Sequence, residues 1–380
     1  MKQKPTPEED IRVPLYEQEK NAGEMIFCVT GAGGYTGGEI VRRLLHAGTF
    51  TVHGTVRGDP EEARYDGLRD LRGSGERLKL FKANLSDFGA FDDPIKSCQA
   101  VIHVAAPVTV KVPPRLIQQE IIRPAIDGVE NVVRAIEQPG CKVKTLVMTS
   151  SVSAAFGDNW ERGKEHIHNE GDWNGVSNEH KFPYAYSKML AEKKAWELYE
   201  SQESRIGGDR KKWRLVTILP GFILGPPATH VKSEVVEFAA MLLQGKIWPF
   251  VPDYQFSYVD LSDVAAAHIL VALDERAHGR YMLAYGSRTL GFAGLLKAVQ
   301  GSFKGYRFPI AVAPKWLLWV LSYVTPLPWD LAAMSVNKPT SFDSQRITQD
   351  TDFVYHDPLE GFRELLDRIL DLNMAPRLAS

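Results

Sequence analysis

The chain has 380 residues, a formal net charge of −2 and a hydrophobic content of 44%. This length accommodates a nucleotide-binding domain with a smaller second lobe, and the composition excludes the disordered and fibrous classes. A nearly neutral chain lacks the long-range field that attracts nucleic acid, so the expected partner is a small-molecule substrate and no nucleic acid.

The first 24 residues are polar and contain no apolar run of the kind that a secretory signal needs. We expect residues 1–24 to form a disordered tail. Cys28, Cys98 and Cys141 lack CxxC spacing, so neither a disulfide framework nor a zinc site is expected. These features predict a cytoplasmic protein.

Apolar, β-rich runs then alternate with amphipathic helical stretches. The expected strands are 25–30, 51–57, 78–84, 100–106, 144–150 and 214–220. This alternation predicts an α/β protein with a doubly wound parallel sheet, the Rossmann arrangement. It stops at PGFILGPP, which predicts a Rossmann domain over 25–225. Residues 226–380 would form mainly a substrate-binding lobe, with segments near 255–285 returning to the first domain.

A glycine turn joins the first strand to the helix EIVRRLLHAG. Gly31, Gly34 and Gly37 have the GxxGxxG spacing that permits a tight turn, close approach to a pyrophosphate and close helix packing. The helix N-terminus would supply N–H groups to the phosphates. We therefore predict a dinucleotide site that includes Tyr35 and Thr36, with an inert turn as the alternative.

The second strand ends in Arg57, where an NAD-selective site would carry an acidic side chain. A guanidinium suits the 2′-phosphate of NADP, and Arg64 could add a second charge. The sequence therefore predicts NADP as the cofactor, with a solvated surface arginine as the alternative for Arg57.

Catalytic residues are expected where a Ser-Ser strand end is followed by a YxxxK helix. Tyr184 and Lys188 are four residues apart and share one helix face. A neighbouring ammonium stabilises phenolate and lowers the tyrosine pKa, which would make Tyr184 a usable proton donor. Ser151, favoured over Ser150, would hold the substrate oxygen. Tyr16 and Lys20 have the same spacing but lie in the polar tail.

Taken together, the motifs resemble an extended short-chain dehydrogenase/reductase, closest to the dihydroflavonol reductase and cinnamoyl-CoA reductase branch. The 3β-hydroxysteroid dehydrogenase branch is also similar. The resemblance spans about residues 25 to 370 and rests on VTGAGGYTGGEIV, GTVRGDP, VIHVAAPV, VMTSSVSA, YAYSKMLAEKKAWE, ILPGFILGP and YVDLSDVAAAHIL.

The resemblance implies roles for individual residues. Tyr184 would be the proton donor, Lys188 would bind the nicotinamide ribose, and Ser151 would orient the carbonyl. The resemblance also implies cofactor contacts for Arg57, Asn84, Leu85, Ala105 and Pro220. Asn84 stands where the family usually has an aspartate near the adenine. Phe156 stands where dihydroflavonol reductases present an asparagine, and HKFPYAYSK replaces the NWYCYGK signature of cinnamoyl-CoA reductases, so neither named substrate carries over.

The expected function is NADP(H)-dependent reduction of an aldehyde or ketone, or the reverse oxidation, on a mainly apolar, aromatic or alicyclic substrate. The alternatives are a nucleotide-sugar epimerase or dehydratase with bound NAD, a sterol enzyme like the 3β-hydroxysteroid dehydrogenases, and a non-catalytic NADP sensor. Either a monomer or a homodimer is compatible with the sequence.

Two other features carry weaker expectations. His166, His168 and His180 cluster before Tyr184, and we expect them to be solvated rather than to bind a metal.

Residues 316–324 are almost uninterruptedly apolar but too short to span a bilayer. They would pack into the second lobe or lie on a membrane interface as a peripheral contact, and the packed arrangement is preferred because the basic face is small.

Overall fold

The computed structural model describes residues 13–107, 112–207, 212–229, 233–322 and 329–375. Its centre is a sheet of seven strands whose neighbours are all parallel. The order across the sheet is β12-β7-β5-β4-β1-β2-β3. The strands are β1 Met25–Thr30, β2 Phe50–Val56, β3 Leu78–Lys82, β4 Ala100–His103, β5 Thr145–Thr149, β7 Arg214–Pro220 and β12 Gly279–Leu283. The chain runs outward from β1 to β3 and then crosses back to β4, so the predicted doubly wound α/β class is confirmed.

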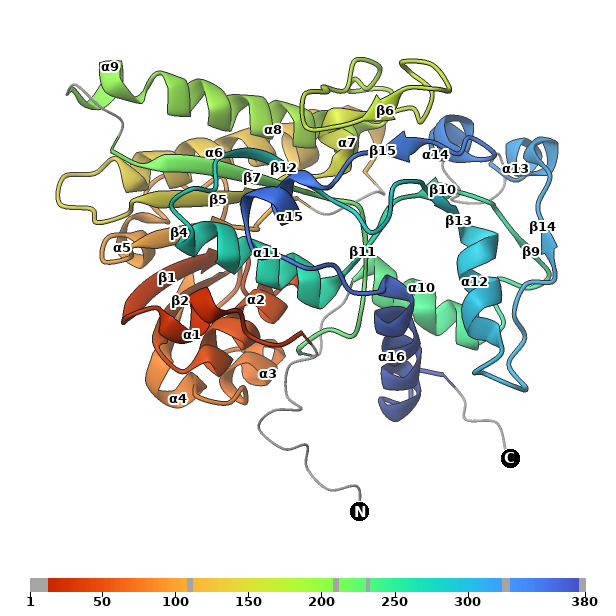
Figure 1. Ribbon diagram of the computed structural model, residues 1–380, viewed down its shortest axis with the longest axis horizontal. Coiled ribbons are helices and arrows are strands. Elements are labelled where there is room, and N and C mark those ends of the chain that lie inside the picture. Colours follow the sequence, from red (N-terminus) through yellow and green to blue (C-terminus); the bar gives the residue numbers. More distant parts are fainter. Residues whose placement is uncertain (1–12, 108–111, 208–211, 230–232, 323–328, 376–380) are drawn as a thin grey trace.

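Helices cover both faces of the sheet (Figure 1). Leu44 of α2 and Val264 of α11 share one buried cluster with residues from β1, β2 and β4. Val132 of α6 and Ala195 of α8 share a second cluster on the other face. These long helices are α2 Tyr35–Ala47, α6 Arg123–Ile136, α8 Pro183–Glu200 and α11 Leu261–Leu273.

The second lobe has a core of its own. Leu242, Leu295 and Leu365 are buried together where α10, α12 and α16 meet. The lobe's longer helices are α10 Glu234–Leu243, α12 Phe292–Gln300 and α16 Pro358–Asp371. Two short parallel strands, β8 Phe222–Leu224 and β11 Tyr258–Asp260, pair where the chain passes between the sheet and this lobe.

The remaining elements are short. The helices are α1 Glu17–Asn21, α3 Asp66–Arg69, α4 Ser74–Arg77, α5 Asp92–Ile95, α7 Val152–Ala155, α9 Gln202–Ile206, α13 Lys315–Leu321, α14 Trp329–Ser335 and α15 Arg346–Asp350. The strands are β6 Ile167–His168, β9 Phe250–Val251, β10 Gln255–Phe256, β13 Leu290–Gly291, β14 Ala311–Val312 and β15 Ser341–Phe342. A π-helical stretch, Gln118–Ile122, leads into α6.

The expectation of a disordered tail over 1–24 is wrong for residues 13–24, and residues 1–12 lie outside the described residues. Arg43 of α2 is 1% exposed, and Glu19 of α1 is fully buried against it. The guanidinium donates to both Glu19 carboxylate oxygens, at 2.8 and 2.6 Å, and to the carbonyls of Val13 and Pro14 at 2.7 and 2.8 Å. A buried cation needs such partners, so Arg43 holds this polar segment on the domain.

The apolar stretch 316–324 forms α13, except that residues 323–324 lie outside the described residues. Leu318 is buried with Ala313 and Ala332. Trp316, in contrast, is 68% exposed and Trp319 is 48% exposed. The preference for a helix packed into the lobe is therefore wrong for these two side chains. Among the described helices, none combines the length and apolar character that crossing a bilayer requires.

The buried Glu19–Arg43 pair predicts a stability effect. Glu19→Ala should lower the free energy of unfolding by about 3 kcal/mol, because it leaves a buried guanidinium without its counter-charge. Glu17→Ala on the same helix removes only an exposed ion pair with Lys20 and should cost less than about 0.5 kcal/mol. Urea unfolding followed by circular dichroism measures both variants. Equal midpoints for the two would contradict a structural role of this segment.

Candidate active site

The predicted site residues gather at one edge of the sheet. Six of them stand at, or within two residues after, the carboxyl end of a parallel strand: Gly31 after β1, Arg57 after β2, Asn84 after β3, Ala105 after β4, Ser151 after β5 and Pro220 at the end of β7. Carboxyl ends of parallel strands meet at a common edge, and in doubly wound sheets ligands bind there.

The glycine turn forms a cradle that larger residues would fill. Gly31 has a φ of 71°, and Gly34 directly precedes α2. A Cβ on Gly37 would lie 2.2 Å from the Gly31 carbonyl oxygen, and a Cβ on Gly31 would lie 3.0 Å from Ala105 Cα. The first turn of α2 presents backbone N–H groups without intrahelical acceptors, so the cradle fits a pyrophosphate.

Tyr35 and Thr36 occupy the first two positions of α2. The Tyr35 hydroxyl donates to the Gly225 carbonyl at 2.5 Å, which ties the glycine turn to the loop after β8. Thr36 is partly exposed beside the cradle. Tyr35 thus fixes the position of the turn relative to the segment that enters the second lobe.

Arg57 stands exposed at the end of β2, and in the described part of the chain its guanidinium has no hydrogen-bond or ion-pair partner. Arg64 is engaged instead: its guanidinium lies 4.9 Å from the Tyr65 ring centre and pairs with Glu62 at 2.8 Å. The Tyr65 hydroxyl accepts a hydrogen bond from the Gly58 amide at 3.1 Å. Arg57 is therefore the cation beside the cradle that is free to meet a phosphate.

Asn84 and Leu85 follow β3. The Asn84 amide donates to Asp87 at 3.1 Å and is exposed to solvent. The Leu85 carbonyl accepts from the Asn131 side chain at 2.8 Å, and the Leu85 side chain fills the space over Gly128. Both residues lie at the edge where the resemblance places the adenine.

Ala105 is held by Thr30. The Thr30 hydroxyl oxygen accepts from the backbone amides of Val104 and Ala105, both at 3.1 Å, and lies 2.8 Å from His103 Nδ1. A small cavity opens between this turn and α8. Its lining includes His103, Ala105, Ala106, Met148, Thr149, Ser187 and Lys188. The cavity connects the predicted cofactor contact Ala105 to Lys188.

The two serines after β5 have different surroundings. Ser150 is buried, and its hydroxyl donates to Glu192 at 2.6 Å. Ser151 is half-buried at the start of α7, where its oxygen accepts from the Ser153 amide at 3.1 Å. Its hydroxyl hydrogen remains available for a substrate oxygen, so the geometry favours Ser151 over Ser150.

Lys188 carries a cation into the interior. Its ammonium donates to the Thr149 carbonyl at 3.1 Å, and the side chain is 7% exposed. Burial lowers its pKa to about 8, although Glu192 acts in the opposite direction. Burial, with a smaller contribution from the Lys188 charge, lowers the pKa of His103 to about 3 and that of His268 to about 4. Both imidazoles are therefore neutral at physiological pH.

Tyr184 lies one turn before Lys188 on α8, at the partly exposed mouth of the site. Burial of its hydroxyl, with a contribution from Glu234, raises its pKa to about 12. The expectation that Lys188 lowers this pKa is therefore wrong for the protein alone, because burial and the Glu234 charge both raise it. The consequence is a phenol that keeps its proton at neutral pH.

A buried ion pair, which the sequence interpretation missed, supports this helix. Glu192, one turn beyond Lys188, is fully buried and pairs with Arg280 of β12 at 2.8 Å. Glu192 also accepts from the hydroxyls of Ser150 and Thr217, at 2.6 and 2.8 Å. The four-residue steps from Tyr184 through Lys188 to Glu192 are visible in the sequence. The Arg280 partner is not, because only the sheet topology brings β12 there.

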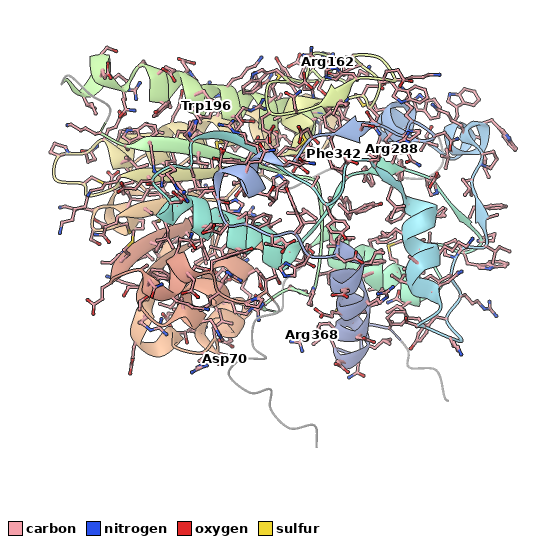
Figure 2. All side chains as sticks on the ribbon, viewed as in Figure 1. Asp70, Arg162, Trp196, Arg288, Phe342 and Arg368 are labelled. Atoms are coloured by element: carbon pink, nitrogen blue, oxygen red, sulfur yellow. The ribbon has the colours of Figure 1, made fainter. Side chains whose placement is uncertain are left out.

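Aromatic rings stack on one another from β8 to β10, where the chain passes from the sheet to the second lobe. Phe222, two residues after Pro220, stacks on Phe256 with ring centres 5.2 Å apart. Phe256 in turn stacks on Tyr254 at 5.7 Å. Phe156 is 7% exposed and packs with Phe342, which Figure 2 labels between the sheet and the second lobe. We call the stacked rings of Phe222, Phe256 and Tyr254, all three partly buried, the aromatic wall.

The histidines before Tyr184 are not all solvated as expected. His180 is exposed, but His168 is fully buried. His166 Nε2 and His168 Nδ1 lie 2.7 and 3.4 Å from Asp172 Oδ2. Arg162, labelled in Figure 2, lies 3.3 Å from the other Asp172 oxygen. Asp172 thus holds His166 by a hydrogen bond and Arg162 by an ion pair, whereas the buried His168 Nδ1 has no hydrogen-bond partner among the described residues. One ligand atom each of His166, His168 and Asp172 lies within 4.8 Å of the others.

Comparison with known proteins places these features in a family. A model described as the NAD dependent epimerase/dehydratase family matches residues 27–284. Cinnamoyl-CoA reductase 1 from Arabidopsis thaliana is 37% identical over 71% of this chain and 73% of its own length. Tetraketide alpha-pyrone reductase 1 from the same plant is 35% identical over 76% and 82%.

Solved structures agree with these matches. The structure of Gre2 from Candida albicans in complex with NADPH is 26% identical and superposes with a TM-score of 0.72, covering 91% of this chain and 99% of that one. The resemblance inferred from the motifs, to the dihydroflavonol reductase and cinnamoyl-CoA reductase branch of extended short-chain dehydrogenases, is confirmed.

The lowered pKa of Lys188 predicts how stability depends on pH. Between pH 8 and 10.5 the unfolded chain binds the Lys188 proton and the folded chain does not, so the free energy of unfolding should rise with pH. The rise from this group should approach about 3 kcal/mol. Lys188→Met removes this pH dependence. The free energy of unfolding of wild type minus that of the variant should therefore increase between pH 8 and pH 10.5. Parallel stability curves for the two proteins would contradict a desolvated ammonium at this position.

Proposed function

Since the chain belongs to the NAD dependent epimerase/dehydratase family and is an oxidoreductase, we propose that it uses NADPH to reduce an aldehyde or ketone on a mainly apolar, aromatic or alicyclic substrate. The observation that carries the proposal is the position of α8. The Lys188 ammonium of this helix donates to the Thr149 carbonyl at the end of β5 and lines a small cavity with Ala105, and Tyr184 lies one helical turn earlier.

In this proposal a nicotinamide bound at the carboxyl edge supplies hydride to the substrate carbon. Ser151 donates a hydrogen bond that fixes the carbonyl oxygen. Tyr184, protonated at neutral pH, gives its proton to that oxygen as negative charge develops there. Lys188 binds a ribose hydroxyl of the cofactor, and its charge stabilises the phenolate that Tyr184 becomes.

The cofactor is proposed to be NADPH rather than NADH. Arg57 is exposed at the end of β2 and is free to form charge-assisted hydrogen bonds with a 2′-phosphate. The glycine cradle would hold the pyrophosphate, and Ala105 and Pro220 are the residues that the family resemblance assigns to cofactor contact. The solved Gre2 structure contains NADPH, which supports the same choice.

The proposed substrate class follows from the aromatic wall. Stacked rings from Phe222 to Tyr254 offer dispersion contacts and faces for another ring, but few hydrogen bonds. A nucleotide-sugar epimerase, the family's other main activity, needs polar groups for a diphosphate in this region. The protein as purified would also retain tightly bound NAD in that case, which extraction and chromatography can detect.

Tyr184→Phe tests the proton donor. The variant should lose about 10² to 10⁴ in kcat because only general acid catalysis is removed, while the dissociation constant for NADPH stays within about twofold. Tyr186→Phe on the same helix is the matched control and should keep wild-type activity. If Tyr184→Phe keeps more than about a tenth of the rate, Tyr184 is not the donor.

Arg57→Ala tests the cofactor assignment. Losing a charge-assisted contact that only the 2′-phosphate makes should raise the KM for NADPH about tenfold or more and leave the KM for NADH nearly unchanged. Arg64→Ala serves as the comparison, since Arg64 already pairs with Glu62. Equal effects of Arg57→Ala on both cofactors would contradict recognition of the 2′-phosphate.

A further inference from the structure

β9, β14 and α13 lie together at the end of the second lobe (Figure 1), and exposed apolar side chains concentrate on them. Half of the strongly exposed large hydrophobic side chains in the described residues come from these elements and their flanking turns. We call this group the aromatic end; its members are Trp248, Phe250, Ile310, Val312, Trp316, Trp319 and Val320. Single exposed apolar residues are ordinary, but a contiguous group of this size marks an interaction surface.

The local structure keeps the aromatic end exposed. β9 and β14 pair in parallel, and α13 begins three residues after β14. Leu318 anchors α13 to the lobe. Trp316, Trp319 and Val320 stand at i, i+3 and i+4 and therefore share the other side of the helix. The two indoles are thus held outward by the fold.

The two sequence stretches that supply the aromatic end carry charges of one sign. The stretches 244–250 and 301–322 contain Lys246, Lys304, Arg307 and Lys315 but no Asp or Glu. The whole chain, in contrast, has 47 acidic and 45 basic residues, so this region departs from the average. Lys246, Lys304 and Arg307 are exposed, and Arg307 lies beside Gly245 next to Lys246.

We propose that the aromatic end docks the protein onto the surface of an anionic phospholipid bilayer. Tryptophan and other amphipathic aromatic residues prefer the headgroup level of a membrane, where the ring is buried and the indole N–H stays hydrated. Basic side chains at the rim add attraction to anionic lipid. α13 has seven residues and is about 10 Å long, so it lies in the interface and does not cross the roughly 30 Å hydrocarbon core.

A second copy of the chain fits this surface less well. In a two-fold dimer the same patch faces itself, so the basic rim of one protomer would meet the basic rim of its partner. Like charges placed together oppose association, and these stretches supply no acidic residue to compensate. An anionic bilayer offers an apolar interior edge to the exposed rings and negative headgroups to the basic side chains.

Docking also places a lipophilic substrate near the catalytic edge. Tyr254 packs against the cluster that contains Leu318 of α13. From Tyr254 the stacked rings of Phe256 and Phe222 continue toward Pro220. The docking itself does not depend on the proposed reductase activity, and its test measures lipid binding alone.

The test is flotation of the purified full-length protein with vesicles of phosphatidylcholine that contain about 30% phosphatidylserine, compared with phosphatidylcholine alone. Wild type should float with the anionic vesicles at 0.1 M salt and much less at about 0.5 M salt, because salt screens the basic rim. Trp316→Ser/Trp319→Ser should lower the partition coefficient at least about tenfold. Phe88→Ser, which alters another strongly exposed aromatic residue near α5, is the matched control and should float like wild type.

Lys304→Gln/Arg307→Gln measures the electrostatic contribution to vesicle binding. Each cation is expected to contribute about fivefold to partitioning onto anionic lipid, so this variant should bind phosphatidylserine vesicles about 25-fold more weakly. The proposal is overturned if wild type fails to float, or if the double tryptophan variant floats as well as wild type. It is also overturned if light scattering without lipid shows a dimer that Trp316→Ser/Trp319→Ser abolishes.

Discussion

The positive charge of Lys188, buried at the end of β5, is the interaction on which the rest of the site depends. A desolvated ammonium is costly unless fixed dipoles and counter-charges surround it. Here the Thr149 carbonyl accepts its hydrogen bond, and Glu192 lies one turn further along α8. Glu192 is in turn satisfied by Arg280 from the edge strand of the sheet. Through Lys188 and the neighbouring Glu192, α8 is therefore linked to both β5 and β12.

The same network separates the roles of neighbouring residues. Glu192 takes the hydrogen bond of Ser150, and Ser151 is the serine that we propose to bind a substrate oxygen. His103 and His268 lie close enough to feel the Lys188 charge, and because both are neutral they add no further positive charge beside it. A parallel sheet is suited to this arrangement, since the ends of strands that are distant in sequence meet at one edge.

Much of this could be predicted from the sequence, because it depends on local patterns. The glycine spacing after β1 requires a tight turn wherever it occurs between a strand and a helix, and the Tyr184–Lys188 step is one helical turn. What could not be predicted depends on distant contacts or on burial. Glu19 looks like one more acidic residue in a polar segment until the fold buries Arg43 against it. The pKa of Tyr184 was expected to fall, but it rises because desolvation depends on the surrounding atoms.

We propose that the carboxyl edge of this sheet carries out NADPH-dependent reduction of apolar carbonyl compounds. The most direct measurement is NADPH absorbance at 340 nm with purified protein and a panel of aromatic, alicyclic and aliphatic aldehydes and ketones. NADPH oxidation should depend on the substrate, be fastest with ring-containing carbonyl compounds and be at least about tenfold slower with NADH. No turnover of any carbonyl compound by protein that binds NADPH, or equal use of the two cofactors, would contradict it.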